Sequence, residues 1–367
     1  MKIIQVVNAL KLRAGAEIFT IDLSICMKEK YHADITILCL YDDMDLSLVN
    51  YANSHGISVI CLNKNRTFDF KCFRKFRNYI ISNKPDVVNL HNSCLTSYFF
   101  AFGFKKQDFK LVKSVHSLCL NDLRGGDRFF QKKYIRKNII TLACDSDEVR
   151  KSVIEYYKKM NVAVNPITCR VGTSMKRVSS PRTAPINPDL NFVCVARFYP
   201  VKNQIILAKA FKKYHSLYSN SRLTFVGDGP ELLNCNDYIN QSKIDDAVTF
   251  AGVQTNVKKF LDSSDVFVLP SLYEGLGMCV LEAFARGLPA IVSNVGGLLD
   301  IVKNEENGLL FESNNVDSLF HQMIAMHDNK DFYSLFSRKN FLNYADYTIE
   351  KCSDEYFAIY FEDGCKS

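Results

Sequence analysis

Several features that mark common protein classes are missing from this sequence. The 13 cysteines are an odd number and contain no C-x-x-C pair, so we predict neither a disulfide framework nor a zinc site and interpret them as reduced core residues. The seven histidines show no H-E-x-x-H or comparable spacing, and no metal site is expected. The longest apolar stretches, such as residues 98–104, are far shorter than the roughly 20 residues that span a bilayer.

A cleavable leader is also not expected. Residues 1–8 form an apolar run of strand length with only Lys2 before it and no cleavage region after it, which favours a cytoplasmic protein. At 367 residues the chain is too long for one ordinary core, and we predict two domains of about 150 to 200 residues.

Charge is divided unevenly along the chain. Residues 1–170 hold 27 lysines and arginines against 16 aspartates and glutamates, a net charge of +11, whereas residues 171–367 hold 19 against 23, a net charge of −4. A basic first half suggests an anionic partner on that side, such as nucleic acid, a phospholipid surface or a phosphorylated substrate.

Short apolar runs alternate with longer helical patterns, which is typical of parallel α/β architecture. We predict two doubly wound Rossmann-like domains, residues 1–175 and 191–345, joined by a proline-rich linker at 176–190, with the carboxyl ends of their strands facing a central cleft. The predicted strands are 2–7, 35–40, 58–62, 87–91, 111–115 and 140–143 in the first domain, and 192–196, 223–226, 248–250, 266–269, 290–292 and 308–311 in the second.

Neither half contains the G-x-G-x-x-G dinucleotide-binding pattern. The first strand leads instead into a loop with Gly15 where a helix begins, and a glycine there allows an anion to approach the helix N-terminus. A plain turn is the alternative.

The most informative segment is 265–297, DVFVLPSLYEGLGMCVLEAFARGLPAIVSNVGG. A buried strand ends at Pro270, and a helix is predicted from about Met278. Between them the backbone N–H groups of Gly275, Leu276, Gly277 and Met278 can cradle a phosphate or sugar. Glu274 before the helix and Glu282 one turn inside it can accept hydrogen bonds from sugar hydroxyls. Alternatively, Glu274 caps the helix and Glu282 faces solvent.

Cationic and glycine-rich turns follow the other strands of the second half. Arg197 and Lys202 lie after the strand at 192–196 and can neutralise a diphosphate without a metal, although a solvated basic turn is the alternative. Gly227 and Gly252 end the next two predicted strands at the same sheet edge.

These residues resemble the family-4 retaining glycosyltransferases of GT-B fold. The match consists of R-x4-K at Arg197 and Lys202, a G-D-G-P turn from Gly227, the V-x-F-x-G strand, E-x7-E at Glu274 and Glu282, and the glycines that follow up to Gly297. The first half is less similar: the family's G-G-x-E loop is present as Ala14-Gly15-Ala16-Glu17, with the first glycine replaced. The segment 346–367 resembles the family helix that packs back on the N-terminal domain.

The resemblance implies a role for each matching residue. Arg197 and Lys202 would bind the donor diphosphate, Glu274 the donor sugar and Glu282 the ribose. Backbone groups at 275–278, Gly227 and Gly15 would hold sugar and phosphate. The donor would be a UDP- or GDP-linked sugar, transferred with retention of configuration and without a cofactor or metal.

Histidines and a serine in the first half also match the family pattern. His116 would contact the transferred sugar near its 6-hydroxyl, while Glu17 and His91 would lie on the acceptor side. Ser146 resembles the start of a family helix. The replacement of Ala14 raises the question of how closely this loop approaches the donor.

Two basic aromatic stretches, 68–80 and 128–138, raise the question of a membrane. Phe70, Phe73, Phe76 and Ile80 have helical spacing with cations between them. The stretch is either an ordinary helix over the sheet or a surface that rests on anionic lipid at the cytoplasmic face of the inner membrane. A lipid-linked or growing bacterial surface polysaccharide (O-antigen, capsule or exopolysaccharide) would then be the acceptor.

Three other interpretations compete. A GT-B epimerase or phosphorylase would share the donor site, but no convincing pyridoxal-phosphate lysine motif is present. A degenerate nucleotide-sugar binder has no need of four intact donor-site residues. Nucleic-acid binding has only the net charge in its favour, and no nucleic-acid partner is predicted.

Overall fold

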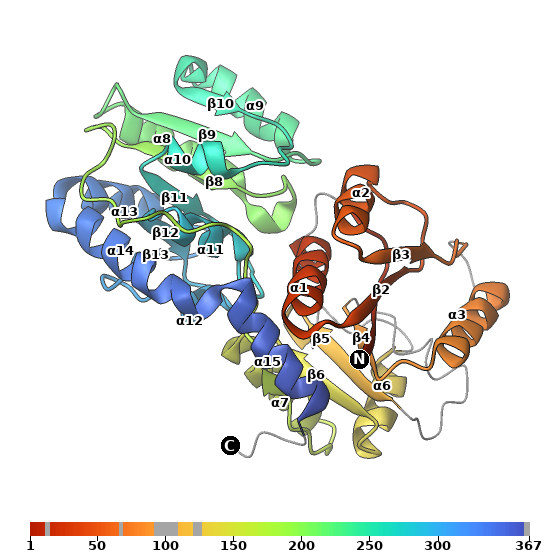
Figure 1. Cartoon of the computed structure of the whole chain (residues 1–367). Helices are drawn as coiled ribbons and strands as arrows, with labels where there is room; N and C mark the ends of the chain where they lie inside the picture. The colour runs from red at the N-terminus through yellow and green to blue at the C-terminus, as the bar shows by residue number, and fades with distance from the viewer. Residues whose placement is uncertain (12–14, 66–68, 92–108, 120–126, 363–367) are drawn as a thin grey trace. The chain divides into compact units, whose positions relative to one another are not determined.

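The computed structural model describes residues 1–11, 15–65, 69–91, 109–119 and 127–362. Its contacts divide the chain into two compact units. The first comprises Met1–Gly172 and Ile349–Ser367, and the second comprises Thr173–Thr348. The chain therefore enters the second unit once, leaves it once, and completes the first unit with its last helix (Figure 1).

The described residues of the first unit form a parallel seven-stranded sheet in the order β3-β2-β1-β4-β5-β6-β7. Six of these strands coincide with the predicted ones to within about a residue. The strands are β1 (Lys2–Val7), β2 (Asp34–Cys39), β3 (Ser58–Cys61), β4 (Val87–Leu90), β5 (Lys110–Val115), β6 (Ile140–Cys144) and β7 (Ile167–Thr168). The helices are α1 (Gly15–Tyr31), α2 (Leu46–Ser54), α3 (Phe70–Asn83), α6 (Asp127–Arg136), α7 (Asp147–Lys158) and α15 (Ile349–Phe361).

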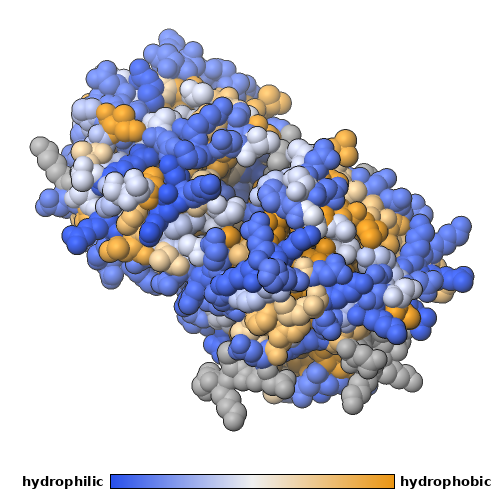
Figure 2. Space-filling model, in the orientation of Figure 1, coloured by the Kyte–Doolittle hydropathy of each residue, from blue (hydrophilic) through white to orange (hydrophobic). Residues whose placement is uncertain are grey.

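Helices α3, α6 and α7 share one core cluster with the sheet. In α3, Phe73, Phe76 and Ile80 are buried in that cluster, as expected for a helix that covers a sheet. Phe70 is different, because 74% of its surface is exposed. The cations of α3 also remain outside, and the molecular face drawn in Figure 2 is mostly hydrophilic with scattered hydrophobic side chains.

The last helix, α15, packs against α1 within the first unit (Figure 1). The rings of Tyr31 and Phe357 stack with centroids 4.0 Å apart. Lys30 and the hydroxyl of Tyr31 both contact the carboxylate of Asp354. Aromatic burial and an ion pair thus attach the end of the chain to the first unit.

The second unit holds a parallel six-stranded sheet in the order β10-β9-β8-β11-β12-β13. The strands are β8 (Asn191–Val195), β9 (Arg222–Val226), β10 (Val248–Phe250), β11 (Val266–Leu269), β12 (Ala290–Ser293) and β13 (Leu309–Phe311). The α-helices are α8 (Gln204–His215), α9 (Leu232–Gln241), α10 (Lys258–Asp262), α11 (Met278–Ala285), α12 (Leu298–Ile301), α13 (Val316–Asp328) and α14 (Lys330–Asn343). Short 3₁₀ helices cover Pro200–Lys202, Asp245–Ala247 and Tyr344–Tyr347.

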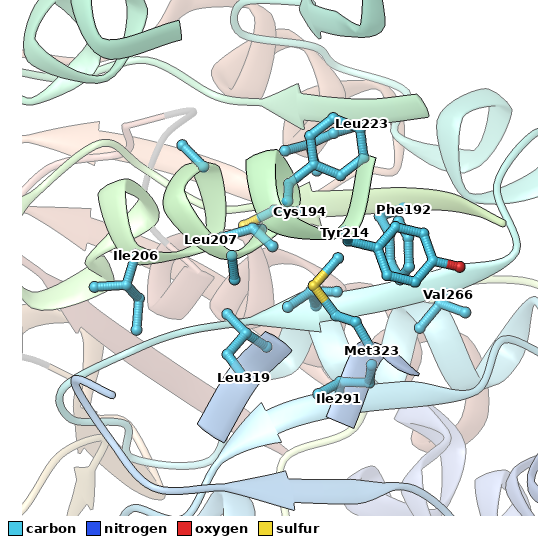
Figure 3. Packing of buried hydrophobic residues seen from close by; sticks show 14 of the residues in the cluster. Phe192, Cys194, Ile206, Leu207, Tyr214, Leu223, Val266, Ile291, Leu319 and Met323 are labelled. Carbon is cyan, nitrogen blue, oxygen red and sulfur yellow. The ribbon is translucent and has the colours of Figure 1, made fainter. Parts of the chain in front are cut away.

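One face of this sheet is covered by α8 and α13, whose apolar residues interdigitate with those of the strands (Figure 3). Phe192 of β8 meets Tyr214 of α8 edge to face, with ring centroids 5.0 Å apart. Leu319 and Met323 of α13 belong to the same fully buried cluster. This packing fixes the strand ends that carry the site.

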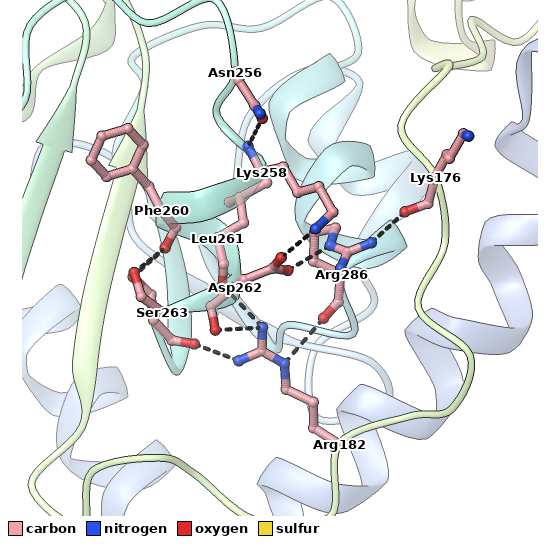
Figure 4. Close-up of polar contacts among 10 residues, drawn as sticks. Lys176, Arg182, Asn256, Lys258, Phe260, Leu261, Asp262, Ser263 and Arg286 are labelled. Carbon is pink, nitrogen blue, oxygen red and sulfur yellow. Dashed lines mark hydrogen bonds and ion pairs between the residues drawn. The ribbon is translucent and has the colours of Figure 1, made fainter.

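Residues 176–190 belong to the second unit and are hydrogen-bonded to it (Figure 4). The guanidinium of Arg182 donates to four carbonyl oxygens, those of Ser264 at 2.5 Å, Leu261 at 3.0 Å, Arg286 at 3.1 Å and Asp262 at 3.4 Å. Two of them, from Leu261 and Asp262, lie at the C-terminal end of α10, where the carbonyl groups of a helix can accept further hydrogen bonds. The sequence predicted a linker here, and in the structure the segment is tied to the second sheet.

Candidate functional site

The order of the second sheet brings two loops together. Strand β8 has β9 on one side and β11 on the other, so successive strands are added outward from β8 first in one direction and then, from β11 on, in the other. Ligands of open parallel sheets bind at such a switch point, beyond the carboxyl ends of the strands. The loop after β8 carries Arg197 and Lys202, and the loop after β11 carries Glu274. A hydrogen bond from Leu272 N–H to the carbonyl of Val201, 2.8 Å long, links the two loops.

Lys202 and Glu274 form an ion pair across these loops. Their side chains are only 18% and 9% exposed. Burial by itself would lower the pKa of Lys202, but the neighbouring carboxylate of Glu274 outweighs burial and the pKa is raised above its usual value. Lys202 is therefore a fixed, charged ammonium, and the alternative of a freely solvated basic turn is wrong for this residue.

Glu274 does not cap helix α11. The N-cap position is Gly277, which has a φ of +89° and no side-chain hydrogen bond. The carboxylate of Glu274 instead accepts a hydrogen bond from Ser271 Oγ at 2.8 Å, besides contacting Lys202. Ser293 Oγ in turn donates to the Ser271 carbonyl at 2.5 Å. A buried serine pair thus positions the carboxylate.

Two glycines after β12 allow this loop to lie where it does. The backbone N–H of Gly297 donates to the Glu274 carbonyl at 3.2 Å. A Cβ atom on Gly297 would lie 1.7 Å from the Gly275 carbonyl oxygen, and one on Gly296 would lie 2.2 Å from the Glu274 carbonyl oxygen. Only glycine fits at both positions, so the G-G element allows close backbone packing against the glutamate loop, residues 270–277, which carries Glu274.

The loop after β8 is supported in the same way. Gly227 has a φ of +142°, and a Cβ atom there would lie 2.0 Å from the Ala196 carbonyl oxygen. The buried amide of Gln204 donates to the Arg197 carbonyl at 2.9 Å. Arg197 itself is exposed, with its guanidinium 5.1 Å from the ring centroid of Tyr199. Its backbone is therefore fixed, while its charged end is accessible.

Glu282 lies on the second turn of α11 and is half-buried. Gly275 and Leu276 are buried, whereas Gly277 and Met278 at the start of the helix are partly exposed. Cys279, beside them, was not predicted as part of the site. Burial, the neighbouring Glu274 and, less strongly, Glu282 raise the pKa of its thiol to about 12, with Lys202 opposing the shift. Cys279 is therefore a neutral thiol at neutral pH.

The first unit has its own polar cluster at the carboxyl ends of β4, β5 and β6. His116 Nδ1 lies 2.9 Å from a carboxylate oxygen of Asp145, and His116 Nε2 lies 3.1 Å from His91 Nδ1. His91 Nε2 is 2.7 Å from Gln5 Oε1. The two histidines predicted separately are therefore in direct contact, and both ring nitrogens of His116 face protein groups.

His91 is fully buried, and burial, followed by the proximity of His116, holds its pKa well below the usual value. Helix α15, although distant in the sequence, forms hydrogen bonds with residues that border this cluster. Asn89 Nδ2 donates to the hydroxyl of Tyr360 at 2.8 Å, and Ser114 Oγ lies 2.8 Å from the hydroxyl of Tyr356. The predicted packing of the C-terminal segment thus reaches the histidine cluster.

Asp145 and Gln5 were missed by the sequence analysis. Asp145 lies two residues after the predicted strand at 140–143 and directly after β6, and this position is the signal that could have found it. Glu17 lies in the first turn of α1 and is buried, and Gly15 begins that helix in an exposed position. Ser146 begins α7, where its hydroxyl accepts a hydrogen bond from the Val149 N–H at 3.2 Å. Ala14 lies outside the described residues.

Among the residues that the structure describes, no three histidine, cysteine, aspartate or glutamate side chains are arranged to hold a metal ion. No helix in those parts of the chain is long and apolar enough to cross a membrane.

Comparison with known proteins gives this architecture a context. Residues 179–345 match the family model described as glycosyl transferases group 1. The UDP-Gal:alpha-D-GlcNAc-diphosphoundecaprenol alpha-1,3-galactosyltransferase of Escherichia coli is 28% identical over 338 residues, 81% of each chain. A glycosyltransferase structure from Rickettsia africae superimposes with a TM-score of 0.79 at 18% identity, covering 100% of this chain and 99% of that one. An Anabaena protein in complex with UDP and glucose gives 0.80 at 14% identity, covering 98% and 99%.

The two parallel Rossmann-like sheets give the chain the architecture of the GT-B fold class. The match to the glycosyl transferases group 1 model, residues 179–345, covers nearly all of the second unit.

Proposed function

We propose that the chain transfers a sugar from a nucleotide-diphosphate sugar to a glycan or lipid-linked acceptor, with retention of the anomeric configuration and without a metal ion. The buried Lys202–Glu274 pair at the switch point of the second sheet carries this proposal. The fixed cation suits the diphosphate of such a donor, and the fixed carboxylate on the adjacent loop suits the hydroxyl groups of its sugar.

Each donor-site residue takes a distinct part. Arg197 and Lys202 bind the diphosphate and stabilise the negative charge that develops on it as the sugar leaves. Glu274 accepts hydrogen bonds from sugar hydroxyls, and Glu282 does so from the ribose. Backbone N–H groups at 275–278 lie at the positive end of the α11 dipole, where they add donors for phosphate or sugar.

Retention follows when the acceptor attacks the face that the phosphate leaves. The acceptor oxygen bonds to the anomeric carbon as the bond from that carbon to the phosphate oxygen breaks, and the acceptor proton moves to the departing phosphate. No protein nucleophile is then required. Cys279, whose thiol is close enough to Glu274 and Lys202 for both charges to act on its pKa, is unsuited to the role because a pKa of about 12 keeps it protonated.

His116 contacts the transferred sugar near its 6-hydroxyl in this proposal. Asp145 holds one ring nitrogen in place, and His91 contacts the other. Glu17 and His91 lie toward the acceptor, with Gly15 at the donor phosphate.

The acceptor we propose is lipid-linked or a growing bacterial surface polysaccharide. One E. coli relative is named for a diphosphoundecaprenol substrate, and another for colanic acid biosynthesis. A mycobacterial relative is named for phosphatidylinositol monomannoside. The basic first half and the cations on the outer surface of α3 support a place for this chain on an anionic membrane surface on the cytoplasmic side.

A thermal-shift screen of UDP-, GDP- and ADP-sugars tests the donor site. A ligand that binds only the folded state at a hundredfold over its dissociation constant stabilises by about 2.7 kcal/mol. One nucleotide class should raise the midpoint, and Glu282→Ala should weaken that shift, since the ribose loses its acceptor. If none of the sugars shifts the midpoint of the wild-type protein, the donor-site assignment is wrong.

A further inference from the structure

The Lys202–Glu274 pair has a consequence for which nucleotides the site accepts. The two groups bind opposite parts of the proposed donor, yet in the structure they neutralise each other. Glu274 is buried and Lys202 is mostly shielded from solvent, and Ser271 Oγ donates to the same carboxylate oxygen of Glu274 that the lysine contacts. A diphosphate that draws the ammonium of Lys202 toward itself therefore weakens an existing ion pair.

A free nucleoside diphosphate that weakens this ion pair loses binding free energy. Glu274 would keep its hydrogen bond from Ser271 but lose part of its cation, in a position where its side chain is 9% exposed. Removing one partner of a buried ion pair is strongly unfavourable, because the remaining charge stays desolvated.

A nucleotide sugar avoids that cost. Its hydroxyl groups are hydrogen-bond donors, and they reach the carboxylate of Glu274 as the diphosphate reaches Lys202. Each member of the ion pair thus exchanges its partner for a ligand group of suitable polarity.

We propose that Glu274 is a specificity-determining residue that, through its ion pair with Lys202, weakens the binding of the nucleoside diphosphate product relative to the nucleotide-sugar donor. This inference rests on the proposed function of the site and adds a selection between substrate and product. Product would leave as Lys202 returns to Glu274.

The test is isothermal titration of UDP, UDP-galactose, GDP and GDP-mannose into the full chain. Glu274→Gln keeps the size of the side chain and its acceptor for Ser271 but removes the charge. This substitution should tighten binding of the free nucleotide about tenfold, because the nucleotide no longer has to weaken an ion pair to reach Lys202. The affinity for the nucleotide sugar should be unchanged or weaker. Glu306→Gln, at an exposed position of the same unit, removes an equal charge and should change neither affinity.

A double-mutant cycle separates ion-pair exchange from simple repulsion between Glu274 and phosphate. In a Lys202→Met background, Glu274→Gln should alter the free-nucleotide affinity less than about twofold, because the pair is already absent. An equal gain in both backgrounds overturns the inference, as does a wild-type-like affinity of Glu274→Gln for the free nucleotide. If neither UDP nor GDP nor their sugars bind the wild-type chain, the proposed function fails and the inference with it.

Discussion

At the scale of the residue, His91 is a fully buried titratable group of the first unit. It is enclosed by Gln5, Asn89 and His116, with Asp145 beyond His116. Burial, with a smaller contribution from His116, keeps its pKa well below the usual value, so the folded protein holds this imidazole neutral.

The linkage gives a pH dependence with a definite sign. Below about pH 6.5 the unfolded chain protonates His91 but the folded chain does not, so the unfolded state binds more protons and stability falls as the pH falls. The loss is up to about 1.4 kcal/mol per pH unit until the folded pKa is reached. Hydrogen exchange of β4 and β5 amides between pH 7 and pH 5 measures it.

A variant at His91 isolates this contribution. His91→Gln should be less stable at pH 7, because the buried network loses a well-packed ring, but its stability should depend less on pH than that of the wild type. His32→Asn, at an exposed histidine, is the matched control and should keep the wild-type slope. Equal slopes for His91→Gln and the wild type would show that His91 is not the group responsible.

Sequence reasoning located the donor-site residues better than it located their partners. Arg197, Lys202 and Glu274 were identified because they follow predicted strands, and Glu282 because it lies one turn inside a predicted helix; the family resemblance assigned their roles. The Lys202–Glu274 pair was not foreseen, since it depends on β8 lying beside β11, a long-range pairing that apolar patterns do not specify. Roles for these residues remain predictions.

At the scale of the element, the backbone of the glutamate loop packs closely against the glycines after β12. Gly297 has a φ for which glycine is not required, so its need for glycine is purely steric. The neighbouring carbonyl of Gly275 occupies the space that a side chain would need.

Gly297→Ala should therefore displace the loop that holds Glu274. We expect a loss of about 3 kcal/mol or more in urea unfolding, at the upper end for overpacking, together with weaker nucleotide binding. Gly252→Ala is the control, because its φ of +65° strains alanine but no atom lies within 4 Å of the new Cβ. It should cost only about 1–2 kcal/mol. Similar effects of both substitutions would contradict the steric explanation.

Element boundaries were largely accessible to the sequence. Short apolar runs between helical patterns located all but one strand of the described sheets. The exception, β7, has only two residues, Ile167–Thr168, at a sheet edge, too few to produce a pattern. Helix α8 begins at Gln204, after a 3₁₀ turn that ends at Lys202, because Asn203 adopts a left-handed conformation with a φ of +51°.

At the scale of the whole molecule, the charge is concentrated in one half. The net +11 of residues 1–170 includes Lys71, Arg74, Lys75 and Arg77 on the exposed surface of α3, a helix without an acidic residue. The apolar face of this helix is already used by the core, so attraction to lipid must come mainly from charge and from Phe70.

We expect the chain to sediment with vesicles containing phosphatidylglycerol at low salt and to dissociate as salt screens the attraction. Replacing Arg74 and Arg77 by glutamate should weaken binding, as each near-surface cation contributes about 1 kcal/mol. Replacing Lys212 and Lys243 of the second unit by glutamate changes the net charge equally and should have little effect. Absence of vesicle binding at low salt would remove the support for a membrane surface.

The two-domain α/β architecture was predictable because strand and helix patterns alternate along the whole chain. The central cleft between the domains stays a prediction. Composition alone did not predict that residues 176–190 would be hydrogen-bonded to the second unit. The carbonyl groups that accept from Arg182 belong to residues about 80 and 104 positions away in the sequence.

The return of α15 to the first unit bears on how the protein is made. Residues 173–348 form a compact unit from one continuous stretch, whereas the first unit needs residues from both sides of that stretch. On a ribosome, the second unit can finish folding while the first still lacks Tyr356 and Tyr360, the partners of Ser114 and Asn89. The half of the chain synthesised first is therefore the half completed last, when α15 has emerged.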